Sequence, residues 1–168
     1  MPEAVGNSCC CGSGLACAEC CQPLLSGVRQ AATASALMRS RYAAFAVDDA
    51  AYLLATWHPQ TRPPQLKPQD LGDVQWLSLQ ITDVASGGEQ DQHGEVEFIA
   101  RYRMNGRVES HHERSRFSRV QGQWLYVDGG LLPTTAAVKT GRNARCECGS
   151  GRKYKQCCGR RSGAYDTL

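Results

Sequence analysis

The feature that most constrains this chain is a cysteine pattern that occurs twice, once near each end. One copy runs from Cys9 to Cys21 and the other from Cys146 to Cys158, and both follow C-x-C-G-S-G-x5-C-C. All 10 cysteines of the chain lie in these two segments, whereas a disulfide framework usually distributes its bridges through the fold. The repeat therefore predicts two small metal-binding modules.

Each copy supplies four thiolates, the ligand set of a closed tetrahedral zinc site. The predicted ligands are Cys9, Cys11, Cys20 and Cys21 in the first module and Cys146, Cys148, Cys157 and Cys158 in the second. Zinc is the expected ion at both sites, although iron also accepts four thiolates. Local disulfides or free thiols are the alternative.

Two further cysteines of the first copy, Cys10 and Cys17, have no counterpart in the second copy. We interpret them as spare thiols beside the metal site. The alternative is a different ligand set or a redox-sensitive first module.

Charge is distributed unevenly along the 168 residues, whose net charge is +3. Residues 139–168 carry eight Lys or Arg against two acidic residues, a net +6. This basic segment predicts an acidic partner, either a protein or a ribonucleoprotein, unless it is simply a solvated tail. The sequence shows no membrane span and no secretory leader, so we expect a protein of the reducing cytoplasm.

The middle of the chain predicts an α+β domain. Helices are expected over Leu37–Val47 and from Asp48 or Asp49 to Trp57, followed by a proline-rich loop. Period-two patterns then predict four strands, at Val74–Ala85, Gly94–Met104, Arg107–Val120 and Gln123–Asp128. The expected domains are residues 1–27, 28–138 and 139–168, with helices packed on one face of a curved antiparallel sheet.

The Asn105-Gly106 dipeptide predicts a two-residue hairpin that sets the register of the second and third strands. In that register Glu97 faces Arg114 and Glu95 faces Arg116 on the outer face. On the inner face, Ala100 meets His111, Phe98 meets Glu113 and Val96 meets Ser115. A second turn at Gln121-Gly122 is expected to bring Tyr126 near Phe117 and Asp128 near Ser115.

Polar side chains on an otherwise apolar inner face predict a pocket. The candidate lining residues are Arg39, Arg41, Tyr102, His111, Glu113, Tyr126 and Asp128. No catalytic residue is assigned, because Glu113 can also serve a structural network by neutralising Arg39 or Arg41.

Several of these segments resemble a known family. Residues 37–45 (LMRSRYAAF), Thr56-Trp57-His58-Pro59, residues 113–117 and Gly122-Gln123-Trp124 resemble the bacterial YchJ family. The paired cysteine pattern resembles the SEC-C motif, which binds metal and contacts a chaperone at the C-terminus of the preprotein-translocase ATPase. The resemblance implies a core similar to nuclear transport factor 2 (NTF2), a cone of curved sheet and helices around a cavity. It implies no activity.

The leading hypothesis is a metal-binding adaptor whose terminal modules bind protein or ribonucleoprotein partners, with a possible homodimer through the central sheet. The alternative is a small-molecule enzyme of the hydrolase, isomerase or dehydratase type. In that enzyme Glu113 or Asp128 is the general base and Arg39 or Arg41 holds an anionic group. A third possibility is that the modules only stabilise the termini of the domain and bind no partner.

Overall fold

The structure is a computed structural model that describes residues 8–134, 142–146 and 151–156. Two compact units are present, one ending at Pro133 and the other beginning at Thr134. Within the described residues, no helix has the length and apolar character needed to cross a membrane.

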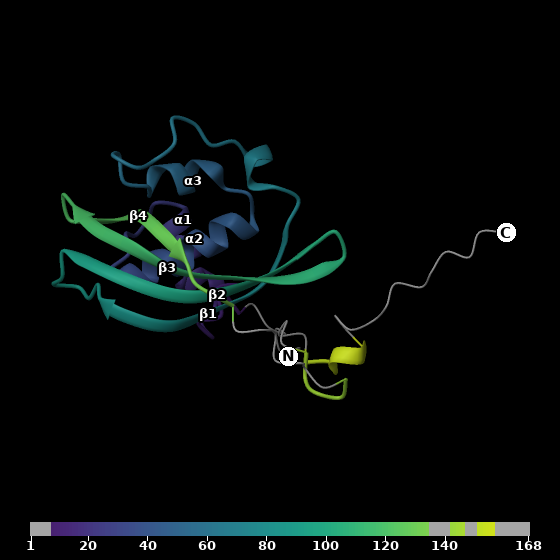
Figure 1. Cartoon of the computed structure of the whole chain (residues 1–168). Helices are drawn as coiled ribbons and strands as arrows, with labels where there is room; N and C mark the ends of the chain where they lie inside the picture. The colour runs from purple at the N-terminus through teal and green to yellow at the C-terminus, as the bar shows by residue number, and fades with distance from the viewer. Residues whose placement is uncertain (1–7, 135–141, 147–150, 157–168) are drawn as a thin grey trace, which may run out of the picture. The chain divides into compact units, whose positions relative to one another are not determined.

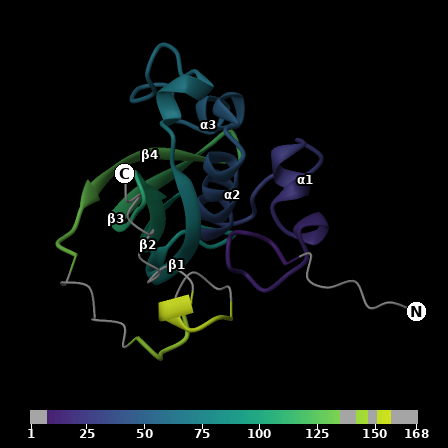
Figure 2. The ribbon, with the colours of Figure 1, turned by 90° about the vertical axis from the view of Figure 1, so that its right-hand side faces the viewer.

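The first unit is built on a four-stranded antiparallel sheet whose strands follow one another in chain order (Figure 1). The strands are β1 (Gln75–Ser86), β2 (His93–Met104), β3 (Arg107–Val120) and β4 (Gln123–Leu131). Helices α2 (Ala34–Ala46) and α3 (Ala50–Ala55) follow the short helix α1 (Gln22–Leu25). Figure 2 shows α2 against the concave side of the sheet. The predicted α+β class with a curved antiparallel sheet is confirmed.

Two side-chain caps set the helix starts. Thr33 Oγ1 accepts a hydrogen bond from the amide of Ala36 and begins α2. Asp49 Oδ1 accepts from the amide of Tyr52 and begins α3. Such caps satisfy amides that have no partner within a helix. They fix the part of α2 that turns Met38 and Tyr42 toward the sheet, where both are buried.

The predicted register between β2 and β3 is confirmed at every pair named above. Phe98 lies opposite Glu113, Val96 opposite Ser115 and Ala100 opposite His111. The turn residues Asn105 and Gly106 have φ values of 51° and 74°, as a two-residue hairpin of the favoured kind requires.

The predicted register between β3 and β4 is right at one end and wrong at the other. Phe117 lies opposite Tyr126 as expected, but a β-bulge between Arg116 and Phe117 shifts the pairing by one residue. Beyond the bulge Asp128 lies opposite Arg116, and Gly129 takes the place opposite Ser115. Because a one-residue shift moves a side chain to the other face of a sheet, Asp128 lies on the outer face.

The core of the first unit includes part of the N-terminal cysteine segment. Cys9, Cys11 and Cys21 are buried in the same cluster as Leu37, Tyr42, Leu79, Val96, Phe98, Phe117 and Trp124. The expected boundary after residue 27 therefore does not separate two structural units, since both sides of it belong to the unit that ends at Pro133.

Candidate functional site

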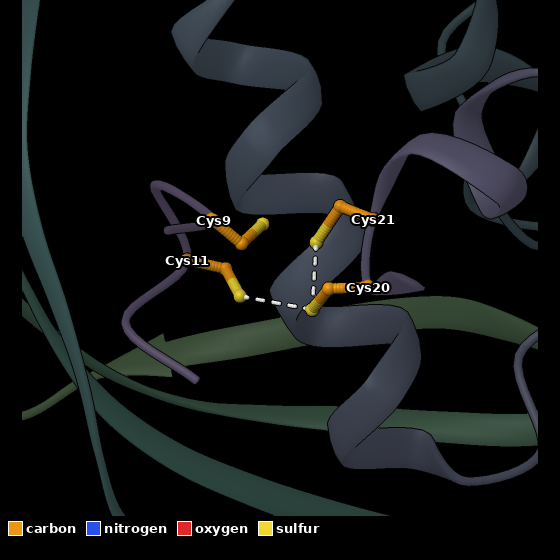
Figure 3. A group of neighbouring side chains, drawn as sticks. All are labelled: Cys9, Cys11, Cys20 and Cys21. Atoms are coloured by element: carbon orange, nitrogen blue, oxygen red, sulfur yellow. Dashed lines mark hydrogen bonds between the residues drawn. The ribbon is translucent and has the colours of Figure 1, made fainter. Parts of the chain in front are cut away.

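Four thiols of the N-terminal segment converge on one point. The sulfur atoms of Cys9, Cys11, Cys20 and Cys21 all lie within 4.8 Å of one another (Figure 3). The Cys11–Cys20 and Cys20–Cys21 sulfur distances are 3.5 and 3.8 Å. Tetrahedral Zn²⁺ with bonds of about 2.3 Å would hold its sulfurs about 3.8 Å apart. The four side chains therefore fit a tetrahedral ion with little movement.

A tight loop brings the two halves of this group together. The amide of Cys9 donates to the carbonyl of Leu15 at 2.8 Å, which closes the loop. Gly12 has a φ of 75°, and a β-carbon at this residue would lie 2.9 Å from the carbonyl oxygen of Leu79. Glycine is required there because the loop passes directly against strand β1. The 3₁₀ turn η1 (Cys17–Glu19) then carries the chain to Cys20 and Cys21.

The surroundings of the group favour a thiolate. Cys11 is fully buried, yet its pKa is lowered to about 4, chiefly by a hydrogen bond from Cys21 and with help from Ser13. The same bond, together with burial, raises the pKa of Cys21. The thiolate is the metal-binding form of cysteine. The lowered pKa therefore prepares Cys11 to bind a cation, and a bound cation would also favour deprotonation of the other three thiols.

Cys10 and Cys17 are not members of this group. Cys10 is exposed as a residue. Partial burial of its thiol, together with the charges of Cys9 and Cys11, raises its pKa to about 11. Burial also raises the pKa of Cys17. Both thiols are therefore protonated at neutral pH, which agrees with their interpretation as spare thiols.

The C-terminal copy has the same backbone conformation where the structure describes it. The amide of Cys146 donates to the carbonyl of Arg152 at 2.6 Å, which repeats the Cys9–Leu15 bond. An antiparallel bridge between Arg145 and Lys153 repeats the bridge between Ser8 and Ala16. The turn η3 (Tyr154–Gln156) occupies the position of η1. Three predicted ligands of this copy, Cys148, Cys157 and Cys158, lie outside the described residues.

The two copies differ in their exposed side chains. In the C-terminal copy five basic residues are exposed: Arg142, Arg145, Arg152, Lys153 and Lys155. In the N-terminal copy the residues equivalent to the last three are Leu15, Ala16 and Ala18, which are also exposed. The chain thus presents one scaffold with two different surfaces.

A second candidate site is a cavity of about 280 Å³ between α2 and the inner face of the sheet. Aromatic side chains form most of its wall: Tyr42, Phe45, Trp57, Trp76, Phe98 and Tyr126. Four polar side chains also line it: Arg41, His111, Glu113 and Ser115. A concave, mostly apolar space with a few convergent polar groups is the usual form of a small-molecule site.

Glu113 is the centre of a hydrogen-bonded network in this cavity. His111 Nε2 lies 2.6 Å from Oε2, and the Ser115 and Tyr126 hydroxyls donate to Oε1 at 2.7 and 3.4 Å. Burial raises the pKa of the Glu113 carboxyl, but the hydrogen bonds from His111 and Ser115 outweigh it and hold the pKa below its usual value. The carboxylate packs so closely on Gly129 that a β-carbon there would collide with it.

Arg41 is the cation of the cavity, and its side chain is buried with 3% exposure. Nη1 donates to the Leu53 carbonyl at 2.8 Å and to Thr56 Oγ1 at 2.7 Å. The guanidinium lies 4.6 Å from the ring centre of Tyr126 and 5.4 Å from that of Trp57. Burial lowers the pKa of Arg41 to about 10, so the group is still charged at neutral pH.

The structure brings four of the seven predicted pocket residues together and places three elsewhere. Arg41, His111, Glu113 and Tyr126 line the cavity. Arg39 instead donates to the carbonyl of Cys11 at 2.7 Å, and the Tyr102 hydroxyl donates to Glu109 at 3.2 Å. Asp128 accepts from Arg116 at 2.6 Å on the outer face, so its expected place beside Ser115 is wrong.

The ion pairs of the described residues include none between Glu113 and Arg39 or Arg41; the partner of Glu113 is His111. The direct ion-pair partner of Glu113 is thus a histidine, although its charge also acts on Arg41 from a distance. Trp57 and Trp76 also line the cavity, although neither was among the predicted pocket residues. The expected second helix reached Trp57, but α3 ends at Ala55 and Trp57 instead forms a bridge with Tyr126, a contact that no local pattern indicates.

Together, the curved sheet with its cavity and the cysteine patterns define an NTF2-like domain with a converging cysteine group at its N-terminal side and a SEC-C motif at its C-terminal side. The family model described as the YchJ middle NTF2-like domain matches residues 33–129, and that of the SEC-C motif matches residues 142–160. The chain belongs to the YchJ family, whose members carry the designation UPF0225.

Relatives match over nearly the whole chain. A UPF0225 protein of Geobacter sulfurreducens is 45% identical and covers 91% of this chain and 98% of its own length. One from Pectobacterium carotovorum is 44% identical, with coverage of 92% and 99%. Among solved structures, a SEC-C motif containing protein of Rhodopseudomonas palustris has a TM-score of 0.62 at 38% identity, covering 75% of this chain and 99% of its own. A SEC-C protein of Psychrobacter arcticus has a TM-score of 0.60 at 26% identity, covering 95% and 98%.

Proposed function

We propose that this protein is a zinc-binding adaptor in which the two cysteine modules have different tasks. The N-terminal site holds the central domain together, and the C-terminal SEC-C unit binds an acidic protein or ribonucleoprotein partner. The observation that carries the proposal is the repeat itself. The same backbone conformation occurs twice: the N-terminal copy is buried in the core, and the C-terminal copy exposes basic side chains.

The structural task of the N-terminal site rests on its packing. Three of its four cysteines are buried, Arg39 ties its loop to α2 through the Cys11 carbonyl, and Gly12 lies against β1. An ion at this site would therefore connect the N-terminal segment to both a helix and the sheet. Binding free energy at such a site is also folding free energy.

The binding task of the C-terminal unit rests on its exposed charge. Arg152, Lys153 and Lys155 stand where the N-terminal copy has one leucine and two alanines, and all three are exposed. Clustered basic side chains attract acidic surfaces and phosphate backbones, with an affinity that falls as salt rises. Nothing about holding a metal requires these charges, since the other copy lacks them.

Metal analysis tests the shared part of the proposal. Protein purified untagged under reducing conditions is expected to contain two zinc ions per chain, because both copies offer only sulfur ligands. Cys20→Ser/Cys21→Ser and Cys157→Ser/Cys158→Ser should each lose one ion. Cys10→Ser, which changes an exposed thiol outside the group, is the matched control and should lose none.

A charge variant tests the adaptor role separately from the metal. Lys153→Ala/Lys155→Ala gives the C-terminal copy the residues found at the equivalent positions of the N-terminal copy, Ala16 and Ala18. The variant should keep both ions and its stability but lose the partners that wild-type protein captures from a bacterial lysate at low salt. Unchanged capture by this variant and by Cys157→Ser/Cys158→Ser would refute the adaptor role.

The enzyme alternative draws support from the cavity and from the His111–Glu113 pair that lines it. Glu113 is the carboxylate that this alternative retains as a general base, because Asp128 lies on the other face of the sheet. The alternative fails if wild-type protein turns over no small ester or hydroxy acid above background, or if Glu113→Gln keeps the wild-type rate.

The possible homodimer and the cytoplasmic location remain predictions. The outer sheet face through which a dimer could form is rich in ion pairs, in which Arg114 contacts Asp83, Glu95 and Glu97. A dimer through that face would have to keep these charges paired. Light scattering during size-exclusion chromatography, repeated at high salt, decides whether the chain associates.

A further inference from the structure

We propose that the cavity beneath α2 is a binding site for a small planar monoanion, such as an aromatic carboxylate, whose charged group meets Arg41 and Trp57. This site is separate from the two cysteine modules, so the proposal stands or falls independently of the adaptor role.

The buried charge of Arg41 points to an anionic ligand. The side chain is buried, and both of its hydrogen bonds in the described structure leave from Nη1 and end on neutral acceptors, a carbonyl and a hydroxyl. The described ion pairs give it no carboxylate, and Glu113, which lines the same cavity, acts on it only at a distance. A buried charge is normally paired, because neutral dipoles replace only part of its lost hydration. An anion in the cavity that Arg41 lines would complete the pairing.

The indole N–H of Trp57, a neighbour of Arg41, is a hydrogen-bond donor without an acceptor in the described part of the chain. Trp57 Nε1 is buried and has no hydrogen-bond partner among the described residues, although Trp57 lines the same cavity. Buried indole N–H groups usually find an acceptor. The Arg41 guanidinium lies over the Trp57 ring, 5.4 Å from its centre, so the charge and the indole are neighbours. An oxyanion there could use both.

The size and polarity of the cavity limit what the rest of the ligand can be. Six aromatic rings line the cavity, and its volume of about 280 Å³ is at the lower limit for ligand sites in general. A mostly aromatic lining of this size favours an apolar body with about one ring. The Glu113 carboxylate already accepts from three protein donors, and its charge disfavours a second anionic group on the ligand. A monoanion is therefore preferred to a dianion.

Binding of benzoate to the full-length, metal-loaded chain tests the site, with benzamide as the neutral isostere and phthalate as the dianion. Titrations followed by NMR chemical-shift changes should show saturable 1:1 binding of benzoate. Benzamide and phthalate should each bind at least about tenfold more weakly, the effect expected for losing one charged hydrogen bond or adding a repelling charge.

Two variants locate the binding. Trp57→Phe keeps the ring but removes the unpartnered N–H, so the protein should stay folded while benzoate affinity falls about tenfold. Arg41→Met should abolish binding, whereas Arg116→Met, a change on the exposed outer face of the sheet and outside the cavity lining, should not alter it. The proposal is overturned if wild-type protein does not bind benzoate saturably at millimolar concentrations, if benzamide binds equally well, or if Trp57→Phe binds like wild type.

Discussion

Two neighbouring glycines of β4 offer a matched test of the Glu113 network. A β-carbon at Gly129 would collide with the carboxyl group and the Cγ of Glu113, whereas one at Gly130 would meet no atom within 4 Å. Neither glycine has a positive φ, so the backbone itself accepts alanine at both positions. Gly129→Ala therefore perturbs Glu113 through space alone, and Gly130→Ala is its control.

The magnitude follows from what Glu113 must give up. To make room for a methyl group the carboxylate has to leave its hydrogen bonds with His111, Ser115 and Tyr126. Hydrogen bonds to a charged group contribute about 1.5–3 kcal/mol each, but they overlap, and the displaced carboxylate regains water. We expect Gly129→Ala to lower the free energy of unfolding by about 2–4 kcal/mol. Gly130→Ala should raise it by about 0.5–1 kcal/mol, because glycine costs that much in a strand.

Urea unfolding of both variants, metal-loaded and under reducing conditions, measures the difference. With a denaturant slope of about 1–3 kcal/mol per molar, the midpoints of the two variants should be separated by at least about 1 M. If both alanines change the midpoint equally, or if Gly129→Ala is the more stable, the Glu113 carboxylate is not confined as the geometry requires.

Three further outcomes are expected. The pKa of Glu113 lies below its usual value, so its charge contributes stability above about pH 4.3, the ordinary pKa, and that contribution is lost as the pH falls through the folded pKa. Glu113→Gln should therefore flatten the fall in the stability of the protein between about pH 5 and pH 3. An unchanged pH profile of stability would contradict this. Gly12→Ala should destabilise more than Gly14→Ala, since both have positive φ but only Gly12 lies against the Leu79 carbonyl, and equal thermal midpoints would show that the loop does not press on β1. Asp128→Asn should leave the urea midpoint close to wild type despite the pair with Arg116, because that pair is exposed; a large loss would restore Asp128 to a structural role.

The parts of the fold that the sequence predicted well are those set by local rules. Asn105-Gly106 can form a tight hairpin of one kind, and once it is in place every pair between β2 and β3 follows by counting. The start of the second helix at Asp49, one of the two starts expected for it, follows equally from short-range chemistry. The convergence of four cysteines was predictable because their spacing repeats.

What the sequence could not supply depends on contacts between distant segments. The bulge at Arg116 and Phe117 leaves no mark in the alternation of β4, so Asp128 was assigned to the wrong face. Arg39 and Arg41 stand two residues apart on α2, and sequence alone cannot tell which faces the cavity and which faces the Cys11 carbonyl. The burial of the cysteines in the main core was also missed, because a short cysteine segment carries no pattern that names its neighbours.

Helix α2 contributes to both candidate sites. Arg39 holds the loop of the thiol group, while Arg41 and Phe45 line the cavity on the same thirteen-residue helix. A shift of α2 when a metal binds would thus change the affinity of the cavity, and thermodynamic reciprocity requires that a cavity ligand change metal affinity by the same factor. In that case metal binding and small-molecule binding would be coupled through α2. Titrating one ligand in the presence and absence of the other measures the coupling free energy directly.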